Sequence, residues 1–437
     1  CASSETRRTR SSGQERWTIG PDGRKRRRRK KVSGGGADSP MSPSSPARGL
    51  GDPSSPSQLS VSQVEEYMLQ ASPVLEAFGN AKTIRNNNSS RFGKHFDVQF
   101  SQSGVILGAF TSTYLLEKPR ITQHMTGERN YHVFYMLCKA PGPVREPVGV
   151  TKWQDYTALN QKGTIEKVET WDDQKEFADM HEAYCKLGFS EAQRTELYAM
   201  LAFVMTLWNL SFVPGKEGSD VKNPKVLDEA AKMIQVTPTQ LADAITFKTM
   251  GGGKLSTYKV PLEPRNATAA KAALCAHVYC LVFDWCVDVI NDYVSVHNAA
   301  YCVGILDIFG FENFSLNSFP QICINFTNES LHNLFIEHVF KLEQEVYVKE
   351  EVEWNFVAYE DNQPVIDLIA KRPICLLGLL DEQCAVGSGT DAATLSNFHQ
   401  TFGGGGKKYA AYVKPRKSAD RTFVLSHFAG DVIYSIE

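Results

Sequence analysis

The chain has 437 residues and a formal net charge of -2, so its bulk charge predicts no particular partner. Hydrophobic residues make up 42% and charged residues 22%, which is ordinary for a soluble protein with a sizeable core. The ten cysteines contain no Cys-x-x-Cys pair and no paired Cys/His spacing. This pattern argues against a disulfide framework or a zinc site and favours a cytosolic protein.

The N-terminal segment, residues 1–60, is basic and of low complexity, with 13 Lys and Arg against 5 Asp and Glu. Because Ser, Pro, Gly and Arg dominate it, the segment cannot bury enough apolar surface to pack, and we expect it to be disordered. A dense basic run lies at 24–31. A solvated, self-repelling tail is the favoured interpretation of this run. A nuclear-import signal, or a patch for acidic lipid, nucleic acid or actin, stays open.

The first predicted helix and strands come directly after this N-terminal segment. Residues 61–70 are amphipathic and predict a helix. An Asn- and Ser-rich loop at 86–94 offers the side-chain oxygens and backbone amides of a ligand-binding loop. Residues 95–100 and 105–116 predict two strands joined by the turn 101–104.

Two long helical patterns occupy the middle of the chain. Residues 172–212 carry apolar side chains at core spacing and predict a helix. The longest apolar run, 272–290, contains Asp284 and Asp288 and has charged residues on both sides. It therefore predicts a buried helix rather than a membrane span.

A short strand with acidic groups at its end follows at 305–312. Apart from Asp307 its first residues are apolar and partly β-branched, which predicts a strand covered on both faces. Gly310 lets the backbone approach a ligand because it has no Cβ, and Glu312 adds a second carboxylate. An acid, a Gly amide and another acid at a strand tip suit Mg²⁺ and a terminal phosphate. An ordinary strand and Gly turn explain these residues equally well.

The C-terminal third predicts helices and a final strand. Residues 317–349 show one apolar side and predict a long helix. A helix, loop and helix follow at 384–402, and then a Gly-rich loop with Lys407 and Lys408. Residues 422–436 alternate in the manner of a strand.

Several of these motifs resemble the myosin motor domain. DIFGFE at 307–312 resembles its switch II, and NNNSSRFGK at 86–94 resembles its switch I, preceded by the similar LEAFGNAKT at 75–83. CINFTNE at 323–329 resembles the relay helix of the family. One departure is Trp208, which stands where the family motif LGNIxF has Gly and which demands extra room.

The resemblance covers 61–437 and implies an α/β fold of the P-loop NTPase type. In this fold a twisted, mixed and mostly parallel sheet is flanked by helices, and here it would be incomplete at both ends. The implied division is a region 61–304 with the upper actin-binding subdomain, and a region 305–437 with switch II, the relay helix and part of the lower actin-binding subdomain.

The resemblance also implies ATP and Mg²⁺ as cofactors and assigns roles to individual residues. The implied catalytic residues are Ser89, Arg91, Gly310 and Glu312. The implied nucleotide-binding residues are Asn86, Asn88, Ser89, Ser90, Lys94 and Gly310. Ser90 would bind Mg²⁺ directly, and Asp307 would hold its water shell. Arg91 and Glu312 would pair behind the γ-phosphate, so we expect them to be neighbours in the fold.

The implied partner is F-actin, in the cytoplasm and associated with the cytoskeleton. The expected actin contacts are Thr390, Asp391, Lys407 and Lys408. Small residues at 385–387 replace the family's Met, Phe and Pro at the tip between the two helices, which predicts weaker actin binding. Light chains or calmodulin would bind only through a neck outside this chain. We expect no nucleic acid as a partner.

The phosphate-cradling loop GxxxxGK[ST] does not occur among the 437 residues. Together with the first residue, Cys1, this indicates a fragment of a motor. We therefore expect the parent protein to be an actin-activated myosin ATPase, and this polypeptide alone to bind ATP weakly or not at all. The alternative is a non-catalytic actin-binding or scaffold protein derived from a motor.

Overall fold

A computed structural model of the chain describes most of the sequence after Leu59. The described residues are 60–250, 258–385, 389–404, 409–415 and 421–436, with the backbone of two short strands nearer the N-terminus. The chain divides into two units, Cys1–Ser57 and Gln58–Glu437.

In the first unit, β1 (Trp17–Ile19) and β2 (Lys25–Arg27) pair antiparallel, and β2 lies within the basic run 24–31. These six residues form strands, where the sequence predicted disorder. The other residues of 1–59 lie outside the described part of the chain, so the expected disorder stays a prediction for them.

A three-stranded antiparallel sheet organises the first part of the second unit. Its strands are β5 (Gly93–Phe100), β6 (Ile106–Tyr114) and β11 (Tyr301–Asp307), in the order β11-β5-β6. The two strands and turn predicted at 95–116 are confirmed. Both strand pairs of this sheet, β11 with β5 and β5 with β6, are antiparallel rather than parallel. For β5 and β6 the reason is the short turn between them, which can only join antiparallel neighbours.

The strand β11 is not buried, contrary to the sequence prediction. All seven of its residues are exposed, and Val303 and Ile305 each keep 54% of their accessible surface. Within the described part of the chain β11 is an edge strand, and the helices pack against β6 at the opposite edge. An apolar run shows that a strand can be covered on both faces, but its burial depends on what packs there.

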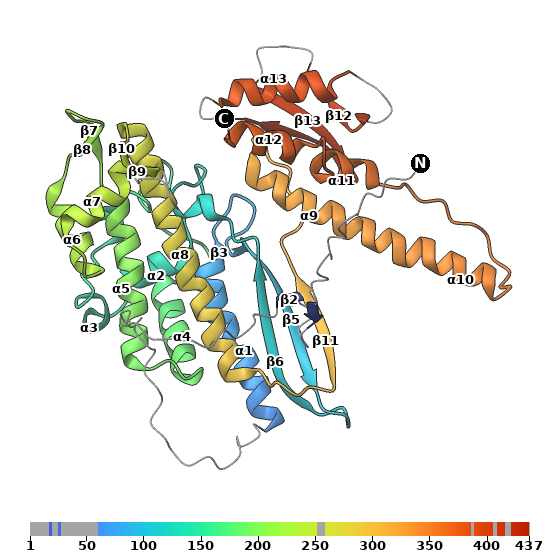
Figure 1. The fold of residues 1–437 in the computed structure, drawn as a ribbon. Helices are drawn as coiled ribbons and strands as arrows, with labels where there is room; N and C mark the ends of the chain where they lie inside the picture. Colours follow the sequence, from blue (N-terminus) through green and yellow to red (C-terminus); the bar gives the residue numbers. More distant parts are fainter. Residues whose placement is uncertain are drawn as a thin grey trace, which may run out of the picture. The chain divides into compact units, whose positions relative to one another are not determined.

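Four long helices cover the sheet and each other. They are α1 (Val61–Gly79), α4 (Asp173–Lys186), α5 (Glu191–Trp208) and α8 (Pro264–Val294). α1 and α8 pack against β6 and against each other, α4 packs against α1, and α5 packs against α8 (Figure 1). A large core forms between them, with Phe78, Tyr184 and Tyr279 fully buried.

The helix α8 contains the long apolar run. It is the one helix among the described residues that is long and apolar enough to cross a membrane by length and composition. One side of it packs into the core through Cys275, Tyr279 and Phe283, each at most 2% exposed. Burial of one side in this way is typical of the central helix of a folded domain.

Two helix boundaries differ from the sequence prediction. α1 continues past residue 70 to Gly79 with Pro73 inside it, so the proline does not end the helix. The predicted single helix 172–212 is two helices, because Gly188 adopts φ 77°, a left-handed conformation that interrupts the helix. Ser190 then caps α5 by accepting a hydrogen bond from the Gln193 amide.

Short elements connect these helices and strands. In chain order they are β3 (Asn80–Ala81), β4 (Ser89–Ser90), η1 (Lys118–Ile121), α2 (His132–Cys138), α3 (Gly142–Arg145), η2 (Trp153–Asp155), β7 (Phe212–Pro214), β8 (Ser219–Val221), α6 (Pro224–Met233), α7 (Pro238–Thr246), β9 (Phe247–Met250) and β10 (Tyr258–Pro261).

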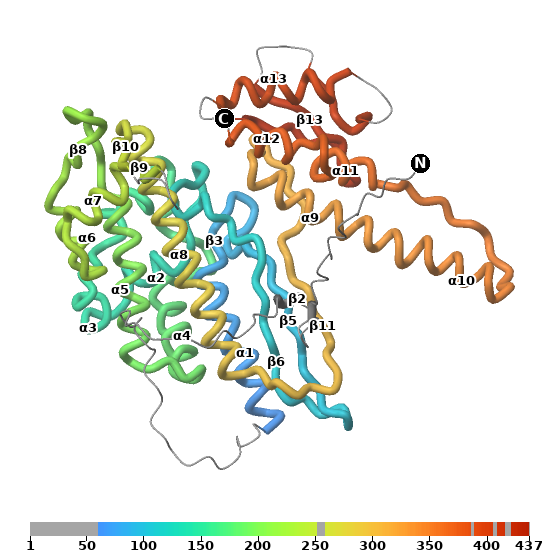
Figure 2. Tube along the Cα trace, in the orientation of Figure 1, coloured from blue at the N-terminus to red at the C-terminus, as the bar shows by residue number. Residues whose placement is uncertain are grey.

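The long helix predicted at 317–349 is confirmed, with a change of pitch inside it. It runs as α9 (Phe319–Phe335), a π-helical segment η3 (Ile336–Leu342) and α10 (Glu343–Lys349). The chain passes from α8 through β11 and then directly into α9 (Figure 2). Glu312 lies in the connection between β11 and α9.

A second, smaller core gathers the C-terminal elements. These are α11 (Gln363–Ala370), α12 (Leu376–Ala385), α13 (Asp391–Phe402), β12 (Tyr412–Val413), β13 (Thr422–His427) and β14 (Gly430–Ser435). The predicted strand 422–436 is a hairpin, since Gly430 at φ 118° allows the chain to turn between β13 and β14. Of the helix–loop–helix predicted at 384–402, the second helix is α13, whereas the helix before it, α12, begins at Leu376 and shares only residues 384 and 385 with the predicted range.

Candidate functional site

Arg91 and Glu312 form a buried ion pair where the loop after β4 meets the connection from β11 to α9. The Nη1–Oε1 distance is 2.6 Å and the Nη2–Oε2 distance is 3.3 Å, so the guanidinium donates to both carboxylate oxygens. Arg91 is 1% exposed and Glu312 is 8% exposed. The two residues are neighbours, as the sequence predicted.

A second carboxylate, Glu117, holds the other side of the same guanidinium. Arg91 Nε donates to Glu117 Oε2 at 2.7 Å, and Arg120 Nε donates to the same oxygen at 2.6 Å. Arg120 also pairs with Glu128, Nη2 to Oε2, at 2.9 Å. Two guanidinium groups thus bind three carboxylates in a cluster of buried side chains.

Opposite charges keep Glu117 and Arg91 ionised although both are buried. Burial alone would raise the pKa of Glu117, but Arg120 and Arg91 together lower it to about 2. Burial likewise opposes the charge on Arg91, and Glu117 and Glu312 nevertheless hold its pKa above the ordinary value. The sequence analysis missed Glu117 and Arg120. The only local signal was their three-residue spacing just after β6.

The Asn-rich loop is shaped by its own side chains. Asn86 Oδ1 accepts the Asn88 amide at 2.9 Å, which closes an Asx turn. The Asn86 carbonyl accepts the Thr83 amide at 2.8 Å. Ser89 Oγ accepts from Arg91 Nη1 at 3.2 Å, so the hydroxyl lies beside the buried ion pair.

Two more residues of this loop are tied to the elements around it. Asn88 Nδ2 donates to Glu76 Oε2 at 3.1 Å, and its Oδ1 accepts from Asn80 at 3.0 Å. Ser90 pairs with Asn80 in the β3–β4 ladder. The Asn88 side chain therefore anchors the loop to α1, and its nucleotide-binding role stays a prediction.

Asp307 ends β11 and faces Lys94 of β5. The Lys94 Nζ–Asp307 Oδ2 distance is 3.2 Å, and the Asp307 side chain is 53% exposed. Among the described residues no group of three or more His, Cys, Asp or Glu side chains is clustered to hold a metal. The hydroxyl of Ser90 and the carboxylate of Asp307 stay a prediction as metal ligands; a small donor set of this chemistry would suit Mg²⁺ with water and phosphate completing its shell.

Gly310 lies in open surroundings. A Cβ placed on it would meet no atom within 4 Å, and the residue is exposed. The neighbouring Phe309 carbonyl accepts from Asn328 Nδ2 of α9 at 3.2 Å. The turn that carries Gly310 is thus attached to the long helix while its backbone stays accessible.

Two of the four predicted actin contacts, Thr390 and Asp391, lie at the start of α13. Thr390 caps that helix by accepting the Ala393 amide at 3.2 Å, and Asp391 follows in the first turn. Lys407 and Lys408 lie outside the described residues, as do two of the three tip residues 385–387.

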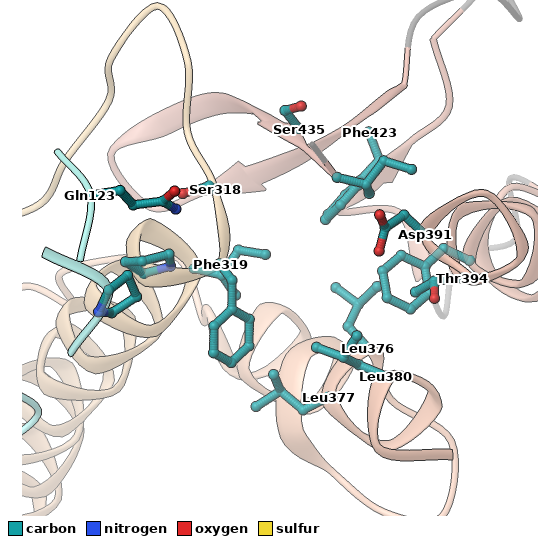
Figure 3. Close-up of a pocket in the computed structure, with 15 residues that line it drawn as sticks. Gln123, Ser318, Phe319, Leu376, Leu377, Leu380, Asp391, Thr394, Phe423 and Ser435 are labelled. Carbon is teal, nitrogen blue, oxygen red and sulfur yellow. The ribbon is translucent and has the colours of Figure 1, made fainter. Parts of the chain in front are cut away.

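An apolar cavity of about 370 Å³ lies beside α13. Gln123 and Ser318 lie on one side of it, and Asp391 and Thr394 lie on the opposite side (Figure 3). Asp391 therefore borders this cavity as well as beginning α13.

The sequence matches the family model described as myosin head (motor domain) over residues 50–437. This chain belongs to the myosin motor domain family. Among curated myosins it is 40% identical to Myosin-17 of Arabidopsis thaliana over 380 residues, which cover 86% of this chain and 24% of that protein. It is 41% identical to the Myosin-I heavy chain of Dictyostelium discoideum over 385 residues, which cover 86% of this chain and 16% of that protein.

This myosin chain spans about a quarter or less of the length of these relatives. Family membership confirms the resemblance found in the sequence, and with it the α/β myosin motor fold. In this myosin the buried pair of Arg91 and Glu312 joins the switch I motif to the switch II motif.

Proposed function

We propose that this chain is part of an actin-based motor that couples the hydrolysis of Mg-ATP to movement along actin filaments. The observation that supports this most directly is the bidentate Arg91–Glu312 pair between the switch I and switch II motifs. A pair of this kind is strong when dry and is directional, so it can close a phosphate site.

The proposed chemistry is phosphoryl transfer to water. It needs charge stabilisation around the γ-phosphate and a water aligned for in-line attack. Ser89 Oγ lies 3.2 Å from Arg91 Nη1, and we propose that it would bind that water or a phosphate oxygen. The accessible Gly310 amide would donate to the γ-phosphate, and Asn86 would donate to other phosphate oxygens.

Mg²⁺, when bound, would neutralise phosphate charge as a Lewis acid. Ser90 would contribute its hydroxyl to the metal, and Asp307 would bind the water shell. Lys94 lies 3.2 Å from Asp307 and would have to share that carboxylate with those waters. We propose Lys94 as a further cation near the phosphates, a role that the family resemblance implies.

The proposed partner is F-actin, which would place the protein on the cytoskeleton. Thr390 and Asp391 begin α13, and we propose that they contact actin with the Gly- and Lys-rich loop that follows that helix. The small residues at 385–387 bury less apolar area than Met, Phe and Pro, so we expect weaker binding than in myosins that carry those residues.

The first experiment titrates the purified chain with Mg-ATP. Because GxxxxGK[ST] does not occur in the chain, we expect weak or undetectable binding. Micromolar affinity would contradict this expectation. Co-sedimentation of the same preparation with F-actin tests the other half of the proposal, and no actin binding at low salt would count against the partner.

The second experiment joins the chain to the N-terminal and C-terminal segments of a myosin motor domain that complete the fold, the N-terminal one carrying GxxxxGK[ST], and measures actin-activated ATPase activity. We expect activity, and we expect Arg91→Ala to abolish most of it. Arg372→Ala is the matched control, since Arg372 forms an exposed pair with Asp381 at 3.1 Å. An inactive protein that still binds actin would instead support a non-catalytic scaffold.

A further inference from the structure

Asn325 of α9 holds the backbone of Glu312 with both ends of its side chain. Its Oδ1 accepts the Glu312 amide at 2.8 Å, and its Nδ2 donates to the Glu312 carbonyl at 2.7 Å. The same Nδ2 donates to Tyr434 Oη at 2.8 Å. Asn325 and Tyr434 are both 0% exposed, so no solvent replaces these bonds.

The contacts continue from Tyr434 through the β13–β14 hairpin and back to α9. Tyr434 Oη lies 2.9 Å from His427 Nε2, and His427 Nδ1 lies 2.8 Å from Glu329 Oε2. Glu329 is 0% exposed and also accepts from Asn362 Nδ2 at 2.6 Å. This series of hydrogen-bonded, buried groups therefore ends at the Glu329 carboxylate, which has several donors.

The number of available hydrogens determines which group donates and which accepts in each of these hydrogen bonds. The two hydrogens of the Asn325 amide are used by the Glu312 carbonyl and by Tyr434 Oη. The Tyr434 hydroxyl then donates its own hydrogen to His427 Nε2, which makes Nδ1 the protonated nitrogen that donates to Glu329. With the opposite tautomer the Tyr434 hydroxyl hydrogen would face another N–H and have no acceptor.

We propose that Tyr434 and His427 are positioning residues that hold Glu312 in place for Arg91 through Asn325. This inference rests on the proposed function only in so far as the Arg91–Glu312 pair closes the phosphate site. Asn325 can keep both bonds to the Glu312 backbone while Tyr434 accepts its second amide hydrogen. When that acceptor is missing, the amide turns or admits water, and the Glu312 carboxylate loses its alignment with Arg91.

The same hairpin is packed against the helix that carries the predicted actin contacts. The Tyr434 ring stacks on Phe423 at 5.6 Å, and Phe423 meets Phe398 of α13 at 5.5 Å. A shift of α13 would therefore reach Tyr434 through direct ring contacts. Coupling along such a path is a matter of energy rather than of proximity, so it has to be measured.

A double-mutant cycle on the full chain tests the proposal. Tyr434→Phe keeps the ring and removes the hydroxyl, and Glu312→Gln removes the charge that Arg91 binds. The equilibrium constant for unfolding in urea is measured for both single variants and for the double variant. We expect the factor by which Glu312→Gln changes the unfolding equilibrium constant to be at least about fivefold smaller in the Tyr434→Phe background than in the native chain. A misaligned Arg91–Glu312 pair stabilises the fold less, so its removal has a smaller effect.

Tyr412→Phe is the matched control. Tyr412 is also buried in this core, it also bonds an imidazole, His399 Nδ1 at 2.8 Å, and it also stacks on Phe423 at 5.8 Å. No bond described for it leads to Glu312. We expect its effect and that of Glu312→Gln to be additive within about twofold.

Additivity in the Tyr434 cycle would overturn the proposal, as would a Glu312→Gln variant that leaves unfolding unchanged. If Tyr434→Phe does not fold, His427→Asn takes its place in the cycle and the same coupling is expected. Because the measurement uses no nucleotide and no actin, it stands or falls separately from the motor function.

Discussion

Arg91 and Glu312, 221 residues apart in the chain, are joined by two hydrogen bonds, and both residues are buried. The same guanidinium is also bound by Glu117, so Arg91 neutralises two carboxylates at once. Removing the Arg91 guanidinium would leave the carboxylates of Glu117 and Glu312 buried without the cation that they share.

Arg91→Met should therefore lower the free energy of unfolding by about 3–5 kcal/mol, since breaking a buried pair leaves uncompensated charge. Arg372→Met is the control, because the exposed pair of Arg372 with Asp381 should contribute at most about 1 kcal/mol. Urea denaturation of the two variants measures the difference. If Arg91→Met and Arg372→Met lowered the free energy of unfolding equally, water would have to reach the Arg91 cluster in solution.

The low pKa of Glu117 predicts acid sensitivity. A carboxyl whose pKa falls from 4.5 to about 2 on folding stabilises the protein at higher pH and loses this contribution as pH falls between the two values. The stability gap between the native chain and Glu117→Gln should therefore narrow as pH is lowered through that window. Asp155→Asn, which removes an exposed carboxylate 3.8 Å from Lys152, is the surface variant measured beside it.

Lys271 predicts the opposite pH dependence. Its Nζ donates to the carbonyls of Trp208 at 2.8 Å and Leu210 at 2.7 Å, and burial lowers its pKa to about 8. In the unfolded chain a lysine titrates near 10.4, so the unfolded state binds more protons between these values and stability rises with pH there.

The native chain should therefore gain stability relative to Lys271→Met as pH rises from about 8 toward about 10. Lys259→Met is the control, because Lys259 is 57% exposed beside Asp243. A pH-independent difference for Lys271→Met would mean that the buried amine is solvated. Trp208 takes part in this site, since the Lys271 amine lies 4.1 Å from the centre of its ring.

Sequence reasoning succeeded where the signal was local. The two strands around 101–104 and the helix at 317–349 follow from short-range periodicity. The proximity of Arg91 and Glu312 came from the resemblance, because nothing local to either residue predicts the other. Glu117 was missed for the same reason: its partner Arg91 lies 26 residues away, and an isolated acid after a strand has many explanations. The exposure of β11 was missed because an apolar pattern does not reveal what packs on it.

The exposed edge formed by β11 predicts association of the isolated chain, since an apolar edge strand with one unpaired side is a template for another strand. Val303 of β11 is 54% exposed and lies opposite Val98 of β5, which is 8% exposed. Val303→Lys should therefore reduce light scattering of a concentrated sample and change the free energy of unfolding by no more than about 0.5 kcal/mol. Val98→Lys, with the same charge on the covered neighbour, should lower stability by several kcal/mol, roughly the penalty of burying an unpaired charge. Unchanged scattering for Val303→Lys would show that association proceeds through another surface.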